Sequence, residues 1–191
     1  QRDLNIALMN DLYMLCEKIN INPYDVIKAC KTKWNFSHYY PGLVGGHCIS
    51  VDPYYLIEYA KKKKFEIKTL KISRQVNERF IKDIENKIKN FFKKNDIFKN
   101  NDILFIGGSY KKNIDDFRNS GALKIFNNIN KSYKKSFLYD PYKIKNKNEL
   151  KSKYKAVIVL VLHDKIKKDK KIMKLISNSK FLLDIFRNLQ K

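Results

Sequence analysis

The chain has 191 residues, of which 43% are hydrophobic, and this is enough to bury a core in one large domain or two small ones. Its formal net charge is +22, but 36 of the 41 basic residues are lysines spread along the chain. Nucleic-acid readers rely on arginine forks, so we expect no nucleic-acid partner.

The composition also bears on membranes, metals and the cellular compartment. The longest apolar run, residues 156–162, is too short for a membrane span of about 20 residues, and the N-terminal pattern is amphipathic rather than that of a signal peptide. Cys16, Cys30 and Cys48 have no paired spacing, which favours a reducing, cytoplasmic location. No Cys or His spacing predicts a zinc site, and no metal is expected.

Helical patterns dominate the first half of the chain. A stripe over residues 3–19 predicts a helix with apolar positions Leu4, Ala7, Leu8, Leu12, Leu15 and Ile19. A short helix is expected at residues 25–31. Another starts at Asp52, which we expect to be its N-cap with Pro53 at the first helical position, and runs to about residue 63. A long amphipathic helix follows at residues 73–92. These helices show more apolar face than so few residues can cover, which suggests a dimer.

The pattern changes after a polar stretch at residues 93–101. Buried strands are then expected at 103–106, 137–139, 156–162 and 181–183. Helices alternate with them, one capped by Asn119 or Ser120 and one at residues 166–177. Continuous apolar strands that alternate with helices predict a parallel sheet covered on both faces. The expected fold is therefore α/β: a helical domain over residues 1–92 and a Rossmann-like domain over residues 93–191.

One glycine-rich stretch organises the first half. Residues 41–56 read PGLVGGHCISVDPYYL, and three of the six glycines of the chain lie here. Cys48 follows the glycine pair and precedes a helix start, where free amides and the helix dipole favour a thiolate. The alternative is that Cys48 is a small buried hydrophobe, as free cysteines commonly are. The residues alone leave both interpretations open.

A second candidate site follows the first strand of the second half. Gly107-Gly108 ends that strand but lacks the G-x-G-x-x-G spacing, so dinucleotide binding there is weakly supported. Lys111 and Arg118 flank the loop at the carboxyl edge of the sheet, where ligands bind in such folds, and together they suit a pyrophosphate. Two solvated surface cations remain the alternative.

Both stretches resemble one enzyme family. Residues 34–36 (WNF), 41–49 (PGLVGGHCI) and 51–56 (VDPYYL), with 110–120 (YKKNIDDFRNS), are similar to the UDP-glucose/GDP-mannose dehydrogenase family. The nearest branch oxidises UDP-N-acetylhexosamines to uronic acids. Ser50 stands where many members have proline, and Tyr110 replaces a phenylalanine. The resemblance covers essentially the whole chain.

The resemblance implies roles for individual residues. Cys48 would be the nucleophile that forms a thiohemiacetal and then a thioester, and Asp52 would take part in proton handling. Arg118 would reach the phosphates of the cofactor, NAD. The implied contacts to the UDP-sugar substrate are Arg2, Tyr39, Gly45 and Lys111. The central helices would form a homodimer interface, and the product would serve surface polysaccharide synthesis.

The family's N-terminal NAD-binding domain and its K-x-x-x-N helix have no counterpart in this sequence. We therefore expect the chain to represent the central and C-terminal portion of such an enzyme and to be inactive alone. The alternative is a non-catalytic module that binds nucleotide sugars or dimerises.

Overall fold

The structure is a computed structural model that describes residues 1–143, 150–187 and 189. It divides into two compact units, Gln1–Phe80 and Ile81–Lys191. Helix α4 (Lys68–Lys94) contributes its first half to one unit and its second half to the other. The boundary predicted between residues 92 and 93 falls within the last turn of this helix. Among the described residues, no helix is long and apolar enough to cross a membrane.

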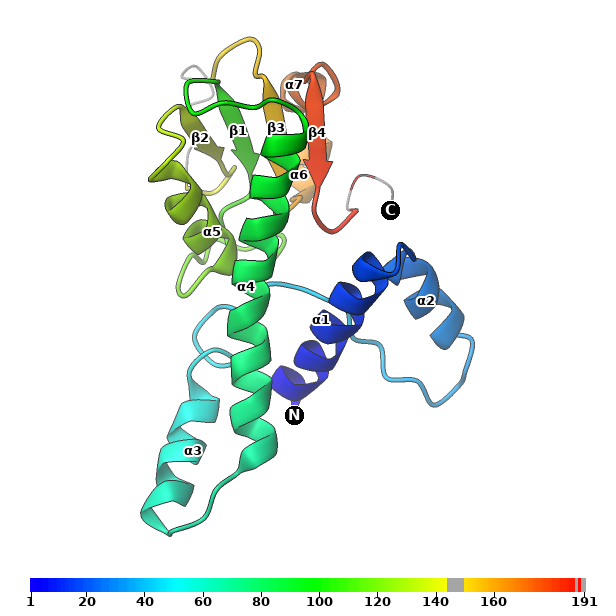
Figure 1. Cartoon of the computed structure of the whole chain (residues 1–191), viewed down its shortest axis with the longest axis vertical. Coiled ribbons are helices and arrows are strands. Elements are labelled where there is room, and N and C mark those ends of the chain that lie inside the picture. The colour runs from blue at the N-terminus through cyan, green and yellow to red at the C-terminus, as the bar shows by residue number, and fades with distance from the viewer. Residues whose placement is uncertain (144–149, 188, 190–191) are drawn as a thin grey trace. The chain divides into compact units, whose positions relative to one another are not determined.

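The first unit is helical, as predicted (Figure 1). It contains α1 (Arg2–Lys18), α2 (Pro23–Cys30), α3 (Asp52–Lys62) and the start of α4. Asn22 caps α2, because its side chain accepts the Tyr24 amide at 3.0 Å and Pro23 occupies the first turn. The expected cap of α3 needs a correction. Val51 is the N-cap, and Asp52 lies in the first helical turn, where its carboxylate complements the helix dipole.

The buried face of α1 is not the predicted apolar stripe. Its buried positions are Asp3, Ala7, Met9, Asn10, Tyr13 and Cys16, and Tyr13 packs edge-on against Phe80 with ring centroids 5.6 Å apart. Four stripe residues are exposed in the single chain, namely Leu4 (37%), Leu8 (62%), Leu15 (54%) and Ile19 (52%). The helix was predicted correctly, but polar groups take part of its inner face and leave leucines outside.

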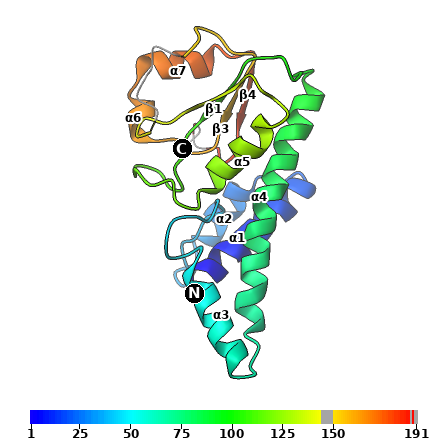
Figure 2. The same ribbon diagram turned by 90° about the vertical axis from the view of Figure 1, so that its left-hand side faces the viewer.

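The second unit is an α/β layer structure. Its parallel sheet has the order β2-β1-β3-β4, formed by Ser136–Tyr139, Ile103–Ile106, Ala156–Val159 and Phe181–Asp184. Helix α5 (Gly121–Asn130) covers one face, and α6 (Asp164–Lys167) with α7 (Lys170–Ser177) covers the other (Figure 2). Strands β1 and β3 are buried along their whole length, which explains their unbroken apolar sequence.

The two sheet faces bury alternate residues of each strand. Leu104, Ile106, Val157 and Val159 join the core that lies under Ile172 and its neighbours on α7. Phe105 points to the opposite face, where it packs against Phe126 of α5 with centroids 5.5 Å apart. The Rossmann-like fold predicted for this half is therefore confirmed.

Several predicted boundaries differ from the structure. Helix α4 starts at Lys68, earlier than the predicted residue 73. Strand β3 ends at Val159 rather than residue 162. The single helix predicted at 166–177 is two helices, because the Asp169 side chain accepts the Lys171 and Ile172 amides and starts α7 anew. Ser120, one of two proposed caps, does cap α5 through the Leu123 amide.

Candidate active site and nucleotide site

Cys48 lies on a loop that leads directly into α3. Gly46 in this loop has a φ of 83°, which favours glycine, and its carbonyl accepts the Ser50 hydroxyl at 2.5 Å. The Cys48 carbonyl accepts the amides of Val51 at 3.1 Å and of Asp52 at 2.8 Å. A single turn therefore joins the two candidate catalytic residues. Both are exposed, so a substrate can reach either.

The other candidates of the first unit lie on separate segments. Gly45 is buried in the same loop as Cys48, and Tyr39 is half-buried upstream of it. Arg2 is exposed at the first turn of α1. Among the described residues, no hydrogen bond or ion pair joins Arg2 or Tyr39 to Cys48. The structure thus brings Gly45, Cys48 and Asp52 together on one segment.

A buried amide holds the start of this loop. The Asn10 side chain donates to the Gly42 carbonyl at 3.1 Å and accepts the Gly42 amide at 2.8 Å. The same Asn10 amide donates to the Asn77 side chain of α4 at 2.9 Å. Asn10 is 1% exposed and Asn77 is 2% exposed, so the bond between their side chains is buried, whereas the two bonds to Gly42 are partly buried. The two bonds to Gly42 pair its amide and its carbonyl, which lie outside any helix or strand and have no partner there.

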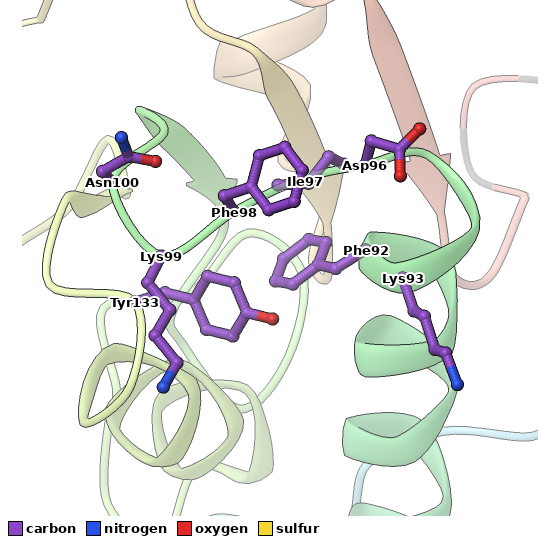
Figure 3. A pocket seen from close by; sticks show the side chains of 8 residues that line it. All are labelled: Phe92, Lys93, Asp96, Ile97, Phe98, Lys99, Asn100 and Tyr133. Carbon is purple, nitrogen blue, oxygen red and sulfur yellow. The ribbon is translucent and has the colours of Figure 1, made fainter.

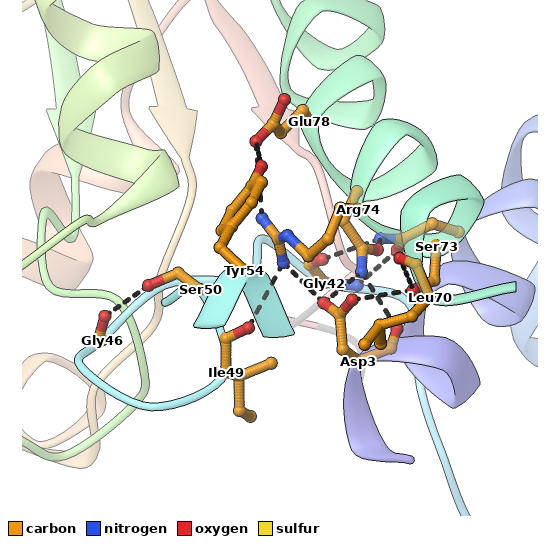
Figure 4. Close-up of polar contacts among 12 residues, drawn as sticks. Asp3, Gly42, Gly46, Ile49, Ser50, Tyr54, Leu70, Ser73, Arg74 and Glu78 are labelled. Carbon is orange, nitrogen blue, oxygen red and sulfur yellow. Dashed lines mark hydrogen bonds and ion pairs between the residues drawn. The ribbon is translucent and has the colours of Figure 1, made fainter. Parts of the chain in front are cut away.

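A buried ion pair holds the other end of the loop (Figure 4). Arg74 of α4 is 6% exposed, and its Nη1 donates to the Asp3 carboxylate at 2.6 Å and to the Ile49 carbonyl at 3.4 Å. The Asp3 carboxylate also accepts the Ser73 hydroxyl at 2.9 Å and the Asn77 amide at 2.8 Å.

Tyr54 completes this arrangement from the first turns of α3. Its ring centroid lies 5.4 Å from the Arg74 guanidinium, and its hydroxyl donates to Glu78. Burial, together with the hydrogen bond to Glu78, raises the pKa of Tyr54. The phenol therefore stays protonated and remains a donor across the neutral range.

In the second unit, the turn after β1 is closed by a carboxylate. The amides of Gly108 and Ser109 both donate to Asp140 Oδ2, at 2.8 and 3.1 Å. Gly107 has a φ of 83°, and a Cβ there would lie 1.9 Å from the Val161 carbonyl oxygen, so this turn requires glycine. The turn's amides are therefore already satisfied inside the protein.

His163 connects Asp140 to the loop that contains Lys111. Its Nδ1 accepts the Asn113 amide at 2.9 Å, so Nε2 carries the hydrogen and faces Asp140 Oδ2 at 3.0 Å. The Ser109 hydroxyl lies 3.2 Å from Nε2 and donates to the Lys111 carbonyl at 2.9 Å. Burial alone would raise the pKa of Asp140, but the hydrogen bonds from His163 and from backbone amides outweigh it and hold this pKa below its usual range.

The cations around this loop have different partners. Lys112 is ion-paired to Asp164 at 2.7 Å, whereas the exposed Lys111 side chain has no ion-pair partner within the described ranges. Arg118 is exposed, but its guanidinium donates hydrogen bonds to the Asp116 carboxylate, from Nε at 3.1 and 3.2 Å and from Nη2 at 2.7 Å. Lys111 is thus the cation of the loop that is available to a ligand.

A pocket of the second unit lies away from this loop (Figure 3). It has a volume of about 720 Å³ and is lined by Phe92, Lys93, Asp96, Ile97, Phe98, Lys99, Asn100 and Tyr133. These residues precede β1 and β2, so the pocket borders the amino edge of the sheet. Nucleotides bind at the carboxyl edge of parallel sheets, where Lys111 lies. The pocket is therefore not the candidate nucleotide site.

The described residues offer neither an NAD pyrophosphate site at the turn after β1 nor a metal site. A dinucleotide fingerprint offers free amides at the first βα turn, but here Asp140 accepts both. This turn does not fit a bound dinucleotide. Within the described residues, no group of three or more His, Cys, Asp or Glu side chains could hold a metal ion.

Both halves of the chain match known protein domains. Residues 1–79 match the central domain of the UDP-glucose/GDP-mannose dehydrogenase family, and residues 104–191 match the UDP binding domain of that family. The chain belongs to this family. The resemblance read from the loop around Cys48 and from residues 110–120 is thereby confirmed.

Individual relatives within the family agree with this assignment. The UDP-N-acetyl-D-glucosamine 6-dehydrogenase of Salmonella typhi is 35% identical over 87% of this chain and 42% of its own length. The structure of a UDP-D-ManNAc dehydrogenase from Pyrococcus horikoshii superposes with a TM-score of 0.81 at 30% identity, covering 95% of this chain and 44% of that one. A UDP-N-acetyl-mannosamine dehydrogenase from S. aureus gives a TM-score of 0.77 at 28% identity over 98% and 45%. The chain thus spans less than half the length of these relatives.

The pairs Asp140-Pro141 and His163-Asp164 resemble pairs in the same family, but the sequence did not predict the contacts that hold the two family motifs in place. Asp3, Ala7 and Asn10 are spaced as one helix face, and so are Ser73 and Asn77. Polar residues on the inner stripe of an amphipathic helix are a signal that could have identified this network. Ser109, Asp140 and His163 meet only through the parallel order of β1, β2 and β3, and no spacing in the sequence reveals that.

Proposed function

We propose that this chain is part of an NAD-dependent UDP-N-acetylhexosamine 6-dehydrogenase that makes uronic acids for surface polysaccharide. The family is NAD-dependent, and the relatives include UDP-N-acetylhexosamine dehydrogenases. The observation that carries the proposal is the exposed Cys48, one turn ahead of Asp52 on a glycine-rich loop. In this proposal the first unit supplies the nucleophile and the second binds UDP.

Cys48 performs the covalent step in the proposed reaction. Once C6 of the substrate is an aldehyde, the thiolate adds to it and gives a thiohemiacetal. Loss of a hydride from C6 to the cofactor would turn this adduct into a thioester, and water then displaces the thiolate and leaves the carboxylate. A thiolate suits both steps because it is a good nucleophile and a good leaving group. Asp52 follows on the first turn of α3 and takes part in moving protons at C6. NAD, which accepts the hydrides, is assigned to a part of the protein outside this chain.

The second unit binds the diphosphate of the substrate. Lys111 projects from the carboxyl edge of the sheet with its charge unpaired among the described residues, so it can pair with a phosphate. Arg118 is proposed to reach the cofactor phosphates, and to do so it must release Asp116. The net charge of +22 helps to attract the anionic substrate.

We further propose a homodimer through the central helices. Leu4, Leu8, Leu15 and Ile19 follow one face of α1 at intervals of four and seven residues, and all four are exposed in the single chain. A second copy of this chain would bury them. The three free cysteines are consistent with a cytoplasmic enzyme.

A non-catalytic nucleotide-sugar module is the second candidate. The turn after β1 does not fit a dinucleotide, and Arg118 is occupied by Asp116. These two observations favour a unit that binds UDP-sugar without holding NAD itself.

Alkylation and mutation of Cys48 separate the two candidates. In this chain, iodoacetamide should modify Cys48 faster than Cys16 or Cys30 near neutral pH, as peptide mass spectrometry can measure. In the protein joined to an NAD-binding domain, Cys48→Ser should abolish uronic acid formation, while Cys30→Ser should leave it unchanged. If the exposed Cys48 is alkylated no faster than the half-buried Cys30, the non-catalytic module is supported. If Cys48→Ser still forms uronic acid, another residue is the nucleophile.

A further inference from the structure

We propose that Arg74 is a positioning residue that fixes Cys48 and Asp52 relative to one another. The inference rests on the proposed function, in which those two residues perform the chemistry. Arg74 lies on α4, distant in sequence from both, and neither the family motif nor the helix pattern singles it out.

The contacts of the Arg74 guanidinium bracket the catalytic segment. Its Nη1 donates to the carbonyl of Ile49, the residue after Cys48, at 3.4 Å. Its Cζ atom lies 5.4 Å from the ring centroid of Tyr54, two residues after Asp52. In Figure 4 the guanidinium points into the space between Ile49 and Tyr54. One guanidinium group therefore contacts the chain within two residues of each candidate catalytic residue.

The guanidinium is itself held by two carboxylates. Asp3 accepts Nη1 at 2.6 Å, and Glu78 lies 3.8 Å from Nη2. Asp3 is 3% exposed and is fixed in turn by Ser73 and Asn77. A planar fork can pair with a carboxylate and stack on a ring at once, whereas the single ammonium of a lysine cannot. The position therefore requires arginine specifically.

The polar character of this cluster is better explained by the loop than by helix packing. Apolar side chains would join α1 to α4 at least as well, because a buried ion pair is weak evidence for stability. The loop, however, partly buries backbone groups that lie outside any helix or strand, and these groups gain from a protein partner. Arg74 supplies one for Ile49, and Asn10 supplies two for Gly42. Both ends of the loop that contains Cys48 are thus tied to one buried network.

The same helix provides a matched control. Arg79 of α4 also pairs with an aspartate of α1, Asp11, at 2.7 Å, but its side chain is 59% exposed, whereas that of Arg74 is 7% exposed. Arg74→Lys and Arg79→Lys are thus the same substitution in two α1–α4 ion pairs, of which the Arg74 pair is buried and bonded to the Ile49 carbonyl and the Arg79 pair is exposed.

Hydrogen exchange of this chain tests the inference. Arg74→Lys should speed amide exchange in residues 43–52 by about tenfold, the scale of losing one hydrogen bond to a charged group. Exchange in α1 and α4 should stay as in the parent chain, and Arg79→Lys should change neither region. The alkylation rate of Cys48 in Arg74→Lys should move toward that of a free peptide spanning residues 44–52.

Two results would overturn the inference. One is unchanged exchange in residues 43–52, and the other is a uniform rise across α1, α4 and the loop, which would mean a merely structural ion pair. If Arg74→Lys does not fold by circular dichroism, Tyr54→Leu decides, because it removes the stacked ring and leaves the ion pair with Asp3 intact. It should loosen residues 50–55, and no change there would refute the role. Retained uronic acid formation in Cys48→Ser would refute the proposed function instead, without affecting these exchange rates.

Discussion

Replacing Lys111 tests the nucleotide site most directly. The adjacent lysines differ in one respect: Lys112 is ion-paired with Asp164 at 2.7 Å, whereas Lys111 has no ion pair among the described residues. A phosphate bound at this loop would gain a charge-assisted hydrogen bond from Lys111, worth about 1.5–3 kcal/mol. Lys111→Ala should therefore weaken UDP binding by roughly 10- to 150-fold. Lys112→Ala is the matched control and should change the affinity by less than about threefold, the scale of an exposed ion pair.

Isothermal titration calorimetry with UDP gives both affinities. Titration at two salt concentrations separates a local contact from general attraction by the cationic surface, because surface charges are screened within about 8–10 Å at physiological ionic strength. The reasoning is refuted if the two variants lose affinity equally, or if the parent chain has none for UDP. Equal affinity for a random oligonucleotide would mean that the charge, not the loop, binds the ligand.

Two further predictions concern assembly and acid stability. Leu8→Glu puts a charge on the exposed stripe of α1, so it should convert the proposed dimer to a monomer in analytical ultracentrifugation. The helical signal in circular dichroism should not change. A monomeric parent chain would contradict the dimer. Asp140 has a lowered pKa in the folded state, so the stability it contributes is present above its unfolded pKa of about 3.9 and is lost as the pH falls through the folded value. Asp140→Asn should thus be destabilised by about 1–3 kcal/mol in urea unfolding at pH 7. The difference from the parent chain should shrink below about pH 4, and a constant difference would show that the carboxylate charge is unimportant.

The sequence predicted the elements of the fold well because their patterns are local. The strand at Ile103–Ile106 is apolar throughout and bounded by polar residues and glycines, so its burial follows from its composition. The helix predicted at 166–177 was wrong in one detail, since Asp169 can either continue a helix or cap a new one. Local propensity does not decide between these outcomes, because tertiary packing does.

The candidate site could be read from the sequence only where a motif is continuous. Cys48 and Asp52 lie four residues apart, so their proximity follows from the chain itself. Arg74 and Asp3 are 71 residues apart, and their pairing depends on how α1 crosses α4. The buried face of α1 was misjudged for the same reason: Asp3 and Asn10 are polar, yet each is fully partnered inside the first unit. Hydrophobic periodicity alone assigns polar residues to the solvent face. It takes no account of a polar partner on another helix that lets such a residue be buried.

The closure of the turn after β1 by Asp140 has a consequence for anion selectivity. In many nucleotide-binding folds such a turn attracts phosphate or sulfate from solution through its free amides. Here the protein supplies its own anion, covalently attached and always present at neutral pH. Free phosphate should therefore not compete at this turn. In the proposed function the nucleotide would be recognised further out on the loop, by side chains such as Lys111 that can be exchanged without altering the backbone beneath. The family could thus vary its sugar and nucleotide preferences around an unchanged strand and turn.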